Sequence, residues 1–366
     1  MEALCRMFVR RVRHGGDVWD KPDGLIDFSA NTNPLGPPRS LLEALKSSLD
    51  FVTRYPDPEH RRLREALSEA NGLRFDEILV GCGSTELIYL AAQVVWRLRG
   101  SAFRVLIAEP TFGEYEVAAA RFMGRPSYVF PRRDDLRFEV DDIIKGIPRN
   151  GLVFLCNPNN PTAQSFNARG VEEVVSESCR LNSVVVVDES FVEFTADPEG
   201  NSVLKQVEGY DNLIVLRSPA KLFAVPGLRV GYGAASIRIA HLIRSLQQPW
   251  SVGVMGEVGL LAALADTEYI RSSTLYVRRE REVFAERLAG LHGLRVYPSD
   301  ANFLLVSTRG VGVGGRSLKR RLVSRGVLIR ECSDFRGLDN HHIRLAVRRG
   351  KENDYLVKVL GEVLGV

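Results

Sequence analysis

RSPAKLFAVPGLRVGY is the sequence of residues 217–232, the stretch around which the rest of the chain is predicted to be organised. It holds one lysine, Lys221, three residues after Ser218 and eight before Arg229. Apolar runs at 213–216 and 228–232 flank this lysine and predict a strand on each side of it. Apolar surroundings and a nearby cation make a lysine amine a useful nucleophile for carbonyl chemistry. A solvated loop lysine is the alternative, and the rest of the chain decides against it.

Length and composition predict a globular protein of about two domains. The chain has 366 residues, of which 45% are hydrophobic, enough for more than one core. The net charge of +4 is small and argues against a nucleic-acid-binding protein. No apolar run approaches the roughly 18 residues of a membrane span. Five scattered cysteines without C-x-x-C spacing predict neither disulfides nor a metal site, and they favour a reducing, cytoplasmic location.

Strand and helix patterns alternate in the first two thirds of the chain. Helices are predicted at 40–49 and 59–71, and further on at 84–98, 113–122 and 169–181. Strands are predicted at 78–81, 104–108, 127–130, 152–156, 183–187 and 213–216. This alternation is typical of an α/β fold with a mostly parallel central sheet and helices on both faces.

The two ends of the chain differ from this pattern. Residues 1–37, with HGG at 14–16 and DFSANTNPLG at 27–36, predict an irregular arm without strand or helix. Past residue 229, helices are predicted at 238–246, 254–264, 267–291 and 352–364, and strands at 294–297, 303–306, 327–330 and 342–346, with a glycine-rich loop at 310–315. The prediction is an arm (1–37) packing with a small α+β domain (256–366), and a large domain (38–255).

Four predicted strands lead into residues that can bind a ligand, because ligands of open parallel sheets lie at the carboxyl ends of the strands. The glycine turn with Ser84 and Thr85 opens a helix and suits a phosphate, or Ser84 is an ordinary N-cap. The loop at 157–162 offers asparagine amides, or is only a turn. Asp188 ends a run of four valines, where a carboxylate needs a cationic or protonated partner. The fourth ending carries Ser218 and Lys221.

Together these endings match the needs of one cofactor. Pyridoxal phosphate requires a lysine, an acid that keeps its pyridine nitrogen protonated, donors for its ring oxygen and an anion site. Each signal is weak alone, but their order along one chain makes a strong joint signal.

The chain resembles the fold-type I aminotransferase superfamily over nearly its whole length. GSTE at 83–86, NPNNPT at 157–162, Asp188-Glu189, and Ser218-x-x-Lys221 with Arg229 carry this resemblance. Within the superfamily it resembles the threonine-phosphate decarboxylases of cobalamin synthesis, through residues 14–16, 27–36, 248–252 and 328–332. Histidinol-phosphate aminotransferases are the main alternative, and a non-catalytic cofactor-binding regulator is disfavoured.

The resemblance implies roles for individual residues. Lys221 would bind pyridoxal 5′-phosphate covalently and Asp188 would pair with its ring nitrogen. Asn160 would bond the ring oxygen of the cofactor, and Phe112 would stack on its ring. The cofactor phosphate would be held by Ser84, Thr85, Ser218, Arg229 and Tyr55. Tyr55 would come from the second subunit of a homodimer. A small phosphorylated amino acid would be bound by His14, Asn31, Asn160, Arg330 and Arg344. Without the resemblance, Arg344 would be predicted to lie at a solvated sheet edge, and His14 would be predicted to be an ordinary turn residue.

Three positions depart from the usual superfamily pattern. Phe191 stands where a tyrosine usually bonds the ring oxygen, Ala220 stands where a serine or threonine usually precedes the lysine, and Ala163 replaces a glycine. None of these changes removes a required group, so they bear on cofactor affinity and leave its identity unchanged.

Overall fold

Seven strands form the larger sheet of the computed structural model, which describes residues 12–100 and 103–366. Residues 1–11 of the predicted arm, Cys5 among them, lie outside the described residues. The strand order is β2-β8-β7-β6-β5-β3-β4. The strands are β2 (Ile78–Gly81), β3 (Arg104–Ala108), β4 (Arg125–Val129), β5 (Leu152–Cys156), β6 (Val184–Asp188), β7 (Leu213–Arg217) and β8 (Gly231–Ala235).

This sheet is mostly parallel, as predicted, and β8 is the exception. It runs antiparallel to both of its neighbours, β2 and β7. The connection from β7 to β8 contains only the short helix α8 (Pro219–Leu222) and a 3₁₀ turn, Pro226–Leu228. A parallel return usually runs through a full crossover helix, which this connection lacks, and the chain reverses its direction between β7 and β8.

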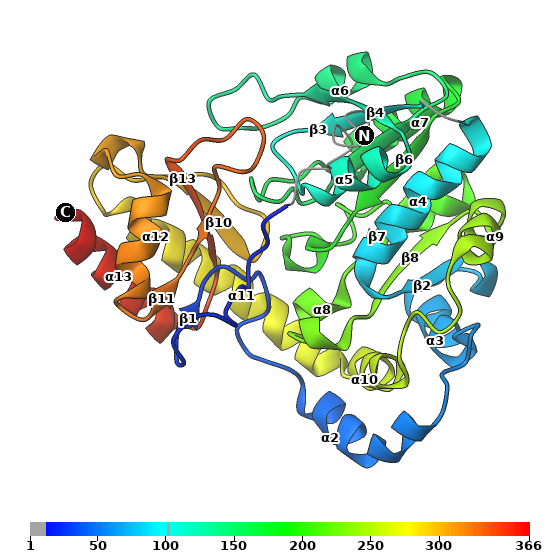
Figure 1. The fold of residues 1–366 in the computed structure, drawn as a ribbon, viewed down its shortest axis with the longest axis horizontal. Helices are drawn as coiled ribbons and strands as arrows, with labels where there is room; N and C mark the ends of the chain where they lie inside the picture. The colour runs from blue at the N-terminus through cyan, green and yellow to red at the C-terminus, as the bar shows by residue number, and fades with distance from the viewer. Residues whose placement is uncertain (1–11, 101–102) are drawn as a thin grey trace, which may run out of the picture.

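Helices cover both faces of the sheet (Figure 1). The valines of β6 alternate between two cores, with Val184 and Val186 in one and Val185 and Val187 in the other. This burial on both faces explains the continuous valine run. One core is shared with α4 (Gly83–Arg99), α5 (Glu114–Arg121) and α9 (Ile237–Leu246). The other is shared with α2 (Arg39–Ser47), α3 (Arg61–Asn71), α6 (Val140–Gly146), α7 (Ala168–Arg180) and α10 (Val254–Leu264).

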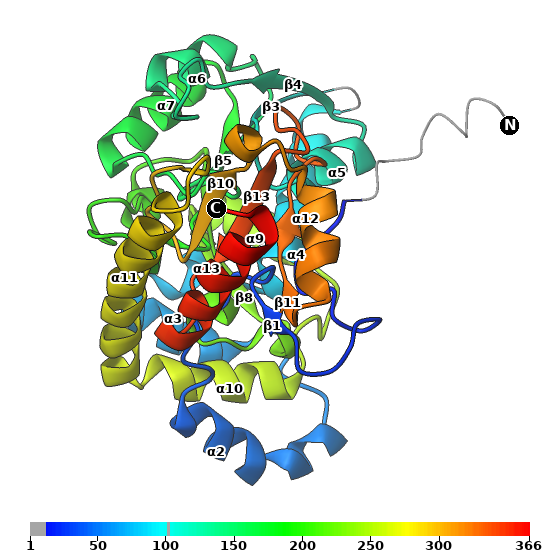
Figure 2. The ribbon, with the colours of Figure 1, turned by 90° about the vertical axis from the view of Figure 1, so that its left-hand side faces the viewer.

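A second, antiparallel sheet forms near the C-terminus, in the order β12-β13-β10-β9. Its strands are β9 (Arg295–Val296), β10 (Phe303–Ser307), β12 (Arg330–Glu331) and β13 (His342–Ala346). A third core joins this sheet to α11 (Thr267–Ala289), α12 (Gly315–Val323) and α13 (Gly350–Leu364). Figure 2 looks onto this side of the molecule, with α13 in front of the strands.

The N-terminal arm is more regular than predicted. Strand β1 (Ile26–Asp27) pairs in parallel with β11 (Val327–Leu328), so the expectation of no strand in the arm is wrong at these two residues. The open edge of β11 supplies backbone partners that the arm's own sequence does not reveal. Phe28 is fully buried in the core of the C-terminal helices. The division into an arm and two domains stays a prediction.

Most element boundaries lie within a few residues of those predicted. Helices α6 and α12 were not predicted, and α12 begins at Gly315, the end of the segment expected to be a loop. The predicted strand at 327–330 is split into β11 and β12. Short elements such as these carry too few turns for their periodicity to be recognised.

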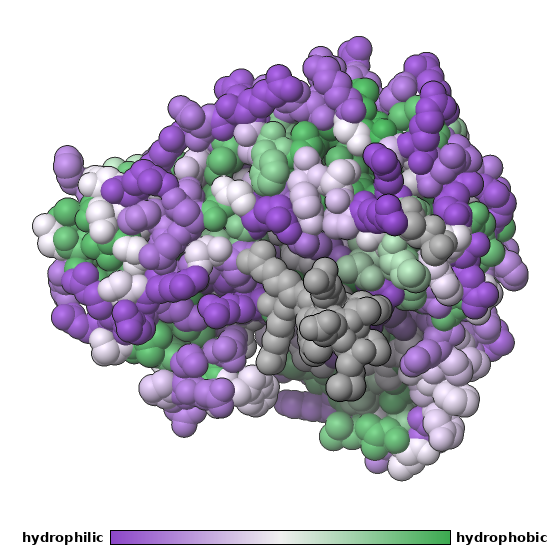
Figure 3. Space-filling model, turned by 45° about the horizontal axis from the view of Figure 1, so that its top comes forward, coloured by the Kyte–Doolittle hydropathy of each residue, from purple (hydrophilic) through white to green (hydrophobic). Residues whose placement is uncertain are grey.

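One face of the molecule is largely hydrophilic. Figure 3 shows hydrophilic side chains over most of one face, with hydrophobic residues in separate patches. Within residues 12–100 and 103–366, no helix combines the length and apolar character needed to cross a membrane. The same residues contain no group of three or more His, Cys, Asp or Glu side chains placed to hold a metal ion.

Candidate functional site

A cavity of about 340 Å³ lies at the carboxyl ends of the parallel strands. Residues of the arm and of the C-terminal strands complete its wall. All but one of the predicted site residues line it; these are His14, Asn31, Ser84, Thr85, Phe112, Asn160, Asp188, Ser218, Lys221, Arg229, Arg330 and Arg344. The exception is Tyr55.

The first turn of α4 forms the anion-binding end of the cavity. The N-cap of α4 is Cys82, whose N–H donates to Glu86 Oε2 at 2.6 Å, so the alternative of an N-cap at Ser84 is wrong. Ser84 and Thr85 lie inside the first turn and line the cavity. The free N–H groups and positive dipole end of a helix suit a phosphate there.

Two glycines let neighbouring groups approach this turn closely. A Cβ on Gly83, whose φ is +74°, would lie 2.6 Å from Arg229 Nη2. A Cβ on Gly231, the first residue of β8, would lie 2.2 Å from the backbone nitrogen of Ser84. Arg229 has a left-handed backbone, with φ of 49°. The arginine, the strand and the helix start therefore meet at one point.

Lys221 lies in α8, directly after β7, and its side chain lines the cavity. Burial lowers the pKa of Lys221 to about 8, with smaller contributions in the same direction from Arg344 and Arg229, while Asp188 opposes them. A substantial fraction of the amine is therefore neutral near physiological pH. The alternative of a solvated loop lysine is wrong, and the requirements of a nucleophilic amine are met.

Asp188 is buried at the end of β6, with an exposed fraction of 3%. Its Oδ1 accepts hydrogen bonds from Ser190 N at 3.0 Å and Ser190 Oγ at 2.5 Å, and its Oδ2 accepts one from Tyr115 OH at 2.9 Å. Burial raises the pKa of Asp188, while these hydrogen bonds and Lys221 oppose the rise. A carboxylate held in this way is well suited to a cationic ring nitrogen.

Arg344 links the second sheet to the floor of the cavity. It lies on β13, between β10 and β12, and is 5% exposed, so the alternative of a solvated sheet edge is wrong. Its guanidinium donates to Asn160 Oδ1 and to Ser29 O, the latter at 2.7 Å. Burial lowers the pKa of Arg344 to about 10. Because the amide oxygen of Asn160 is engaged, its NH₂ group is left to donate to a ligand oxygen.

Arg330 is the second buried cation at this wall. It donates to Arg13 O and to Asp334 Oδ2, both at 2.8 Å, and lies over the ring of Phe335, 4.9 Å from its centroid. These contacts fix the orientation of the guanidinium beside the cavity.

The arm brings His14 and Asn31 to the cavity. His14 is half-exposed, and its Nε2 lies 2.9 Å from Glu114 Oε1. Oδ1 of Asn31 is buried without a hydrogen-bond partner in the described part of the chain, which leaves it available to a ligand. The arm is tied to the lysine segment because Asn33 N donates to Lys221 O at 2.9 Å and Asn33 Nδ2 donates to Leu222 O at 2.8 Å.

Roles for Tyr115, Ser190 and Asn33 at the site were not predicted from the sequence. Ser190 follows Asp188 by two residues, a spacing at which a hydroxyl and N–H often bind an aspartate, and this signal could have revealed it. Nothing in the α5 pattern indicates that Tyr115 reaches β6.

Two of the three residues that depart from the superfamily pattern line the cavity, and the third has a left-handed backbone. Phe191 lines the cavity and packs edge-on against Phe303, with ring centroids 5.0 Å apart. Ala220 also lines the cavity. Ala163 has φ of 63°, in the left-handed region that favours glycine, so the usual glycine has a backbone reason.

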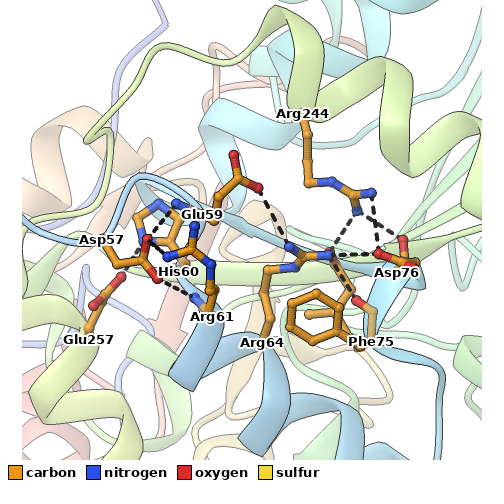
Figure 4. A network of polar contacts seen from close by, with 10 residues as sticks. Asp57, Glu59, His60, Arg61, Arg64, Phe75, Asp76, Arg244 and Glu257 are labelled. Carbon is orange, nitrogen blue, oxygen red and sulfur yellow. Dashed lines mark hydrogen bonds and ion pairs between the residues drawn. The ribbon is translucent and has the colours of Figure 1, made fainter.

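Tyr55 lies outside the cavity lining and is 81% exposed, with its ring 4.7 Å from that of Trp250. The segment after it is anchored by the network in Figure 4, in which His60 bonds Glu257 of α10 and Asp57 accepts from Arg61. Tyr55 is thus held at the surface, and its contribution to a second subunit stays a prediction.

The donors around this cavity fit pyridoxal phosphate. A helix start with an arginine suits the phosphate, a buried carboxylate suits the ring nitrogen, and a free amide suits the ring oxygen, next to a lysine whose amine is partly neutral.

The chain is similar to known proteins over nearly its whole length. The Aminotransferase class I and II family model matches residues 23–360. "Histidinol-phosphate aminotransferase 2" of Archaeoglobus fulgidus is 36% identical over 345 residues, which cover 94% of this chain and 95% of that protein. "Threonine-phosphate decarboxylase" of Salmonella typhimurium is 34% identical over 361 residues, covering 96% of each.

A solved structure has the same fold. It is histidinol-phosphate aminotransferase from Sinorhizobium meliloti in complex with pyridoxal-5′-phosphate, with a TM-score of 0.81 and 25% identity over 92% of this chain and 89% of that one. The chain therefore belongs to the class I and II aminotransferase family, whose members are pyridoxal 5′-phosphate-dependent enzymes of fold type I.

Proposed function

We propose that this protein decarboxylates L-threonine O-3-phosphate, giving (R)-1-amino-2-propanol O-2-phosphate for cobalamin synthesis. The observation that carries the proposal is the pairing of two buried arginines, Arg330 and Arg344, with the arm in a cavity of about 340 Å³. Two guanidinium groups suit a substrate with two anionic groups, and the small cavity suits a short carbon chain. The similarity to the Salmonella threonine-phosphate decarboxylase supports the same substrate.

Each site residue has a part in this proposal. Ser84, Thr85, Ser218 and Arg229 would hold the cofactor phosphate, Asp188 the ring nitrogen, Asn160 the ring oxygen and Phe112 the ring face. Bound there, pyridoxal phosphate would supply an acceptor for the electron pair left on the substrate Cα when CO₂ departs.

The chain's own residues would orient the substrate and return a proton. Arg330 and Arg344, with His14 and Asn31, would bind the phosphate and carboxylate and so decide which bond of Cα breaks. Nζ of Lys221 would carry the proton that replaces the carboxylate on Cα. A non-catalytic regulator would need neither this lysine nor the two arginines.

The proposal includes a homodimer in the cytoplasm. Tyr55 is exposed next to Trp250, and further exposed apolar residues, Leu49, Phe51 and Val52, precede it in the chain. These residues would pack against a second copy, and Tyr55 would reach the cofactor phosphate of that copy.

Histidinol-phosphate aminotransferase is the second candidate. The observation that favours it is the 36% identity to the Archaeoglobus protein, which is similar to the 34% identity to the decarboxylase. Its substrate also carries a phosphate, and 2-oxoglutarate would bring two carboxylates to the same arginines.

Turnover of two substrate sets tests the proposal. The purified protein with pyridoxal phosphate is given phosphothreonine in one reaction, and histidinol phosphate with 2-oxoglutarate in another. Release of CO₂ in the first without glutamate in the second is expected. Glutamate without CO₂ would replace the proposal with the aminotransferase. A Lys221→Ala variant is the blank for both reactions.

A further inference from the structure

The first turn of α5 presents two glutamates that the proposed chemistry does not use. Phe112, just before the helix, lines the cavity, and Tyr115 binds Asp188. Glu114 and Glu116 flank Tyr115 and point to other partners. Each accepts a hydrogen bond from a tyrosine and pairs with a basic side chain from a different part of the chain, His14 for Glu114 and Arg336 for Glu116.

Glu114 holds the N-terminal arm. Its Oε1 lies 2.9 Å from His14 Nε2, and its Oε2 accepts from Tyr89 OH at 2.6 Å. The hydrogen bond to His14 is the largest cause of the lowered pKa of Glu114, so the carboxylate is ionised at neutral pH. The imidazole is half-exposed and makes only a tilted ring contact with Phe112, at 5.8 Å. Glu114 is therefore its main anchor among the described residues.

Glu116 holds the loop that supports Arg330. Nη2 of Arg336 donates to both carboxylate oxygens of Glu116, at 2.8 and 3.1 Å, and Tyr128 OH donates to Oε1 at 2.8 Å. The guanidinium of Arg336 also lies 4.0 Å from the centroid of the Tyr128 ring. Arg336 directly follows Asp334 and Phe335, whose carboxylate and ring hold Arg330.

We propose that Glu114 and Glu116 are positioning residues for the substrate phosphate, one acting through His14 and the other through Arg336 and Arg330. This proposal rests on the proposed function, because it assigns His14 and Arg330 to a phosphorylated substrate. The first turn of α5 thereby joins the arm and the C-terminal loop across the mouth of the cavity. Without these anchors, the two phosphate-binding groups must be ordered by the substrate itself, which reduces affinity.

Variants of the two glutamates give a clear pattern in steady-state kinetics. Glu114→Ala and Glu116→Ala are each expected to raise the KM for the phosphorylated substrate about tenfold with kcat nearly unchanged, as for loss of a charge-assisted hydrogen bond. The double variant is expected to raise it more than either single variant and by no more than about a hundredfold, because the two glutamates act on the same phosphate through different contacts. Glu114→Gln keeps an acceptor for His14 and should restore part of the affinity.

Matched controls separate positioning from folding. Tyr89→Phe removes the other donor to Glu114 and leaves its contact with His14. Tyr128→Phe removes the other donor to Glu116 and one acceptor of Arg336 at 3.2 Å, but leaves both hydrogen bonds from Arg336 to Glu116. Each variant is expected to change KM by less than about threefold. The absorbance of the bound cofactor should be unchanged in every variant. A KM within twofold of the unaltered enzyme in both alanine variants would overturn the proposal. So would a parallel loss of cofactor binding, since it would show that the turn only supports the fold.

Failure of the proposed function is recognised separately, from the substrates that the unaltered enzyme turns over. If the unaltered enzyme uses histidinol phosphate instead, the KM comparison is made with that substrate, and the same tenfold increases are expected. If it uses neither substrate, the proposed function fails, and binding of inorganic phosphate to the holoenzyme is measured by calorimetry. A tenfold weaker phosphate affinity in each alanine variant then supports the positioning role, and equal affinity overturns it.

Discussion

Lys221 sits among groups that act on its charge in opposite directions. Burial, Arg344 and Arg229 favour the neutral amine, and Asp188 favours the ammonium. The balance puts its pKa at about 8, below the ordinary value of 10.5. The neutral amine, which is the nucleophile, is therefore the main form above pH 8, and its fraction falls gradually as the pH decreases below 8.

This pKa predicts the pH dependence of cofactor incorporation. The rate at which the apoenzyme binds pyridoxal phosphate covalently should rise with pH, reach half its maximum near pH 8, and level off above it. Arg344→Gln removes a cation that lowers this pKa, so its midpoint should move to higher pH. Stopped-flow absorbance gives both profiles, with Lys221→Ala as the blank. A rate that still rises about tenfold per pH unit between 9 and 10 would contradict the assignment.

Among single residues, the sequence best predicts as site residues those at or just after the ends of buried strands. Asp188 and Lys221 could be found because the apolar runs of β6 and β7 fix where those strands end. Tyr115 reaches Asp188 from a helix far from it in the sequence, and only the packing of α5 on the sheet brings the two together. Without the family resemblance, Arg344 would be predicted to be exposed, because Arg348 and Arg349 follow it closely in the sequence and the burial of β13 is not visible there.

Among the elements, β8 and α4 depend on a close approach at Gly231. Gly231→Ala would place a Cβ 2.2 Å from Ser84 N and push the helix start away. The Kd of pyridoxal phosphate is expected to rise at least about tenfold while the circular dichroism spectrum is retained. Gly253→Ala is the matched control, since its Cβ would meet nothing within 4 Å. Unchanged cofactor affinity in Gly231→Ala would contradict the role of this contact.

The pair of His60 and Glu257 fastens the start of α3 to α10 (Figure 4). Both side chains are largely buried, so His60→Ala leaves a buried carboxylate without its partner. We expect the Tm to fall by about 4 °C, as for a loss of about 2 kcal/mol. Arg39→Ala, which breaks an exposed pair with Glu43, should shift it by less than about 1 °C. Equal decreases in Tm for the two variants would contradict a stabilising role of the pair of His60 and Glu257.

The sequence predicts an element well where its apolar run is clearly bounded in the sequence. Helix α10 and strands β2, β3, β5 and β13 have the predicted bounds. The direction of β8 could not be predicted from its apolar run, because direction depends on whether the connection after β7 folds into a full crossover helix. Strand β1 forms only because β11 offers it an edge.

The whole molecule brings three distant segments to one cavity. The arm packs Phe28 into the C-terminal core, and Ser29 O accepts from Arg344. The strand alternation predicts the parallel sheet and its ligand edge. It does not predict how the second sheet turns Arg330 and Arg344 towards that edge, because this depends on long-range contacts of the arm and β13.

The proposed homodimer predicts complementation between two inactive variants. If Tyr55 serves the site of its partner, Lys221→Ala and Tyr55→Ala subunits that exchange freely should form hybrids with one intact site. About a quarter of full activity is then expected at equal mixing, because half of the dimers are hybrids with one of two sites restored. Activity is measured before and after exchange. No gain on mixing, with hybrids present in native mass spectrometry, would contradict the shared site.

In the proposed reaction, CO₂ leaves the substrate Cα and a proton replaces it. Mass spectrometry of the product formed from phosphothreonine in D₂O tests this most directly. The expected product is 1-amino-2-propanol phosphate with one deuterium bound to the carbon that lost CO₂. A 2-oxo acid phosphate that retains the carboxylate, with pyridoxamine phosphate formed in equal amount, would contradict it.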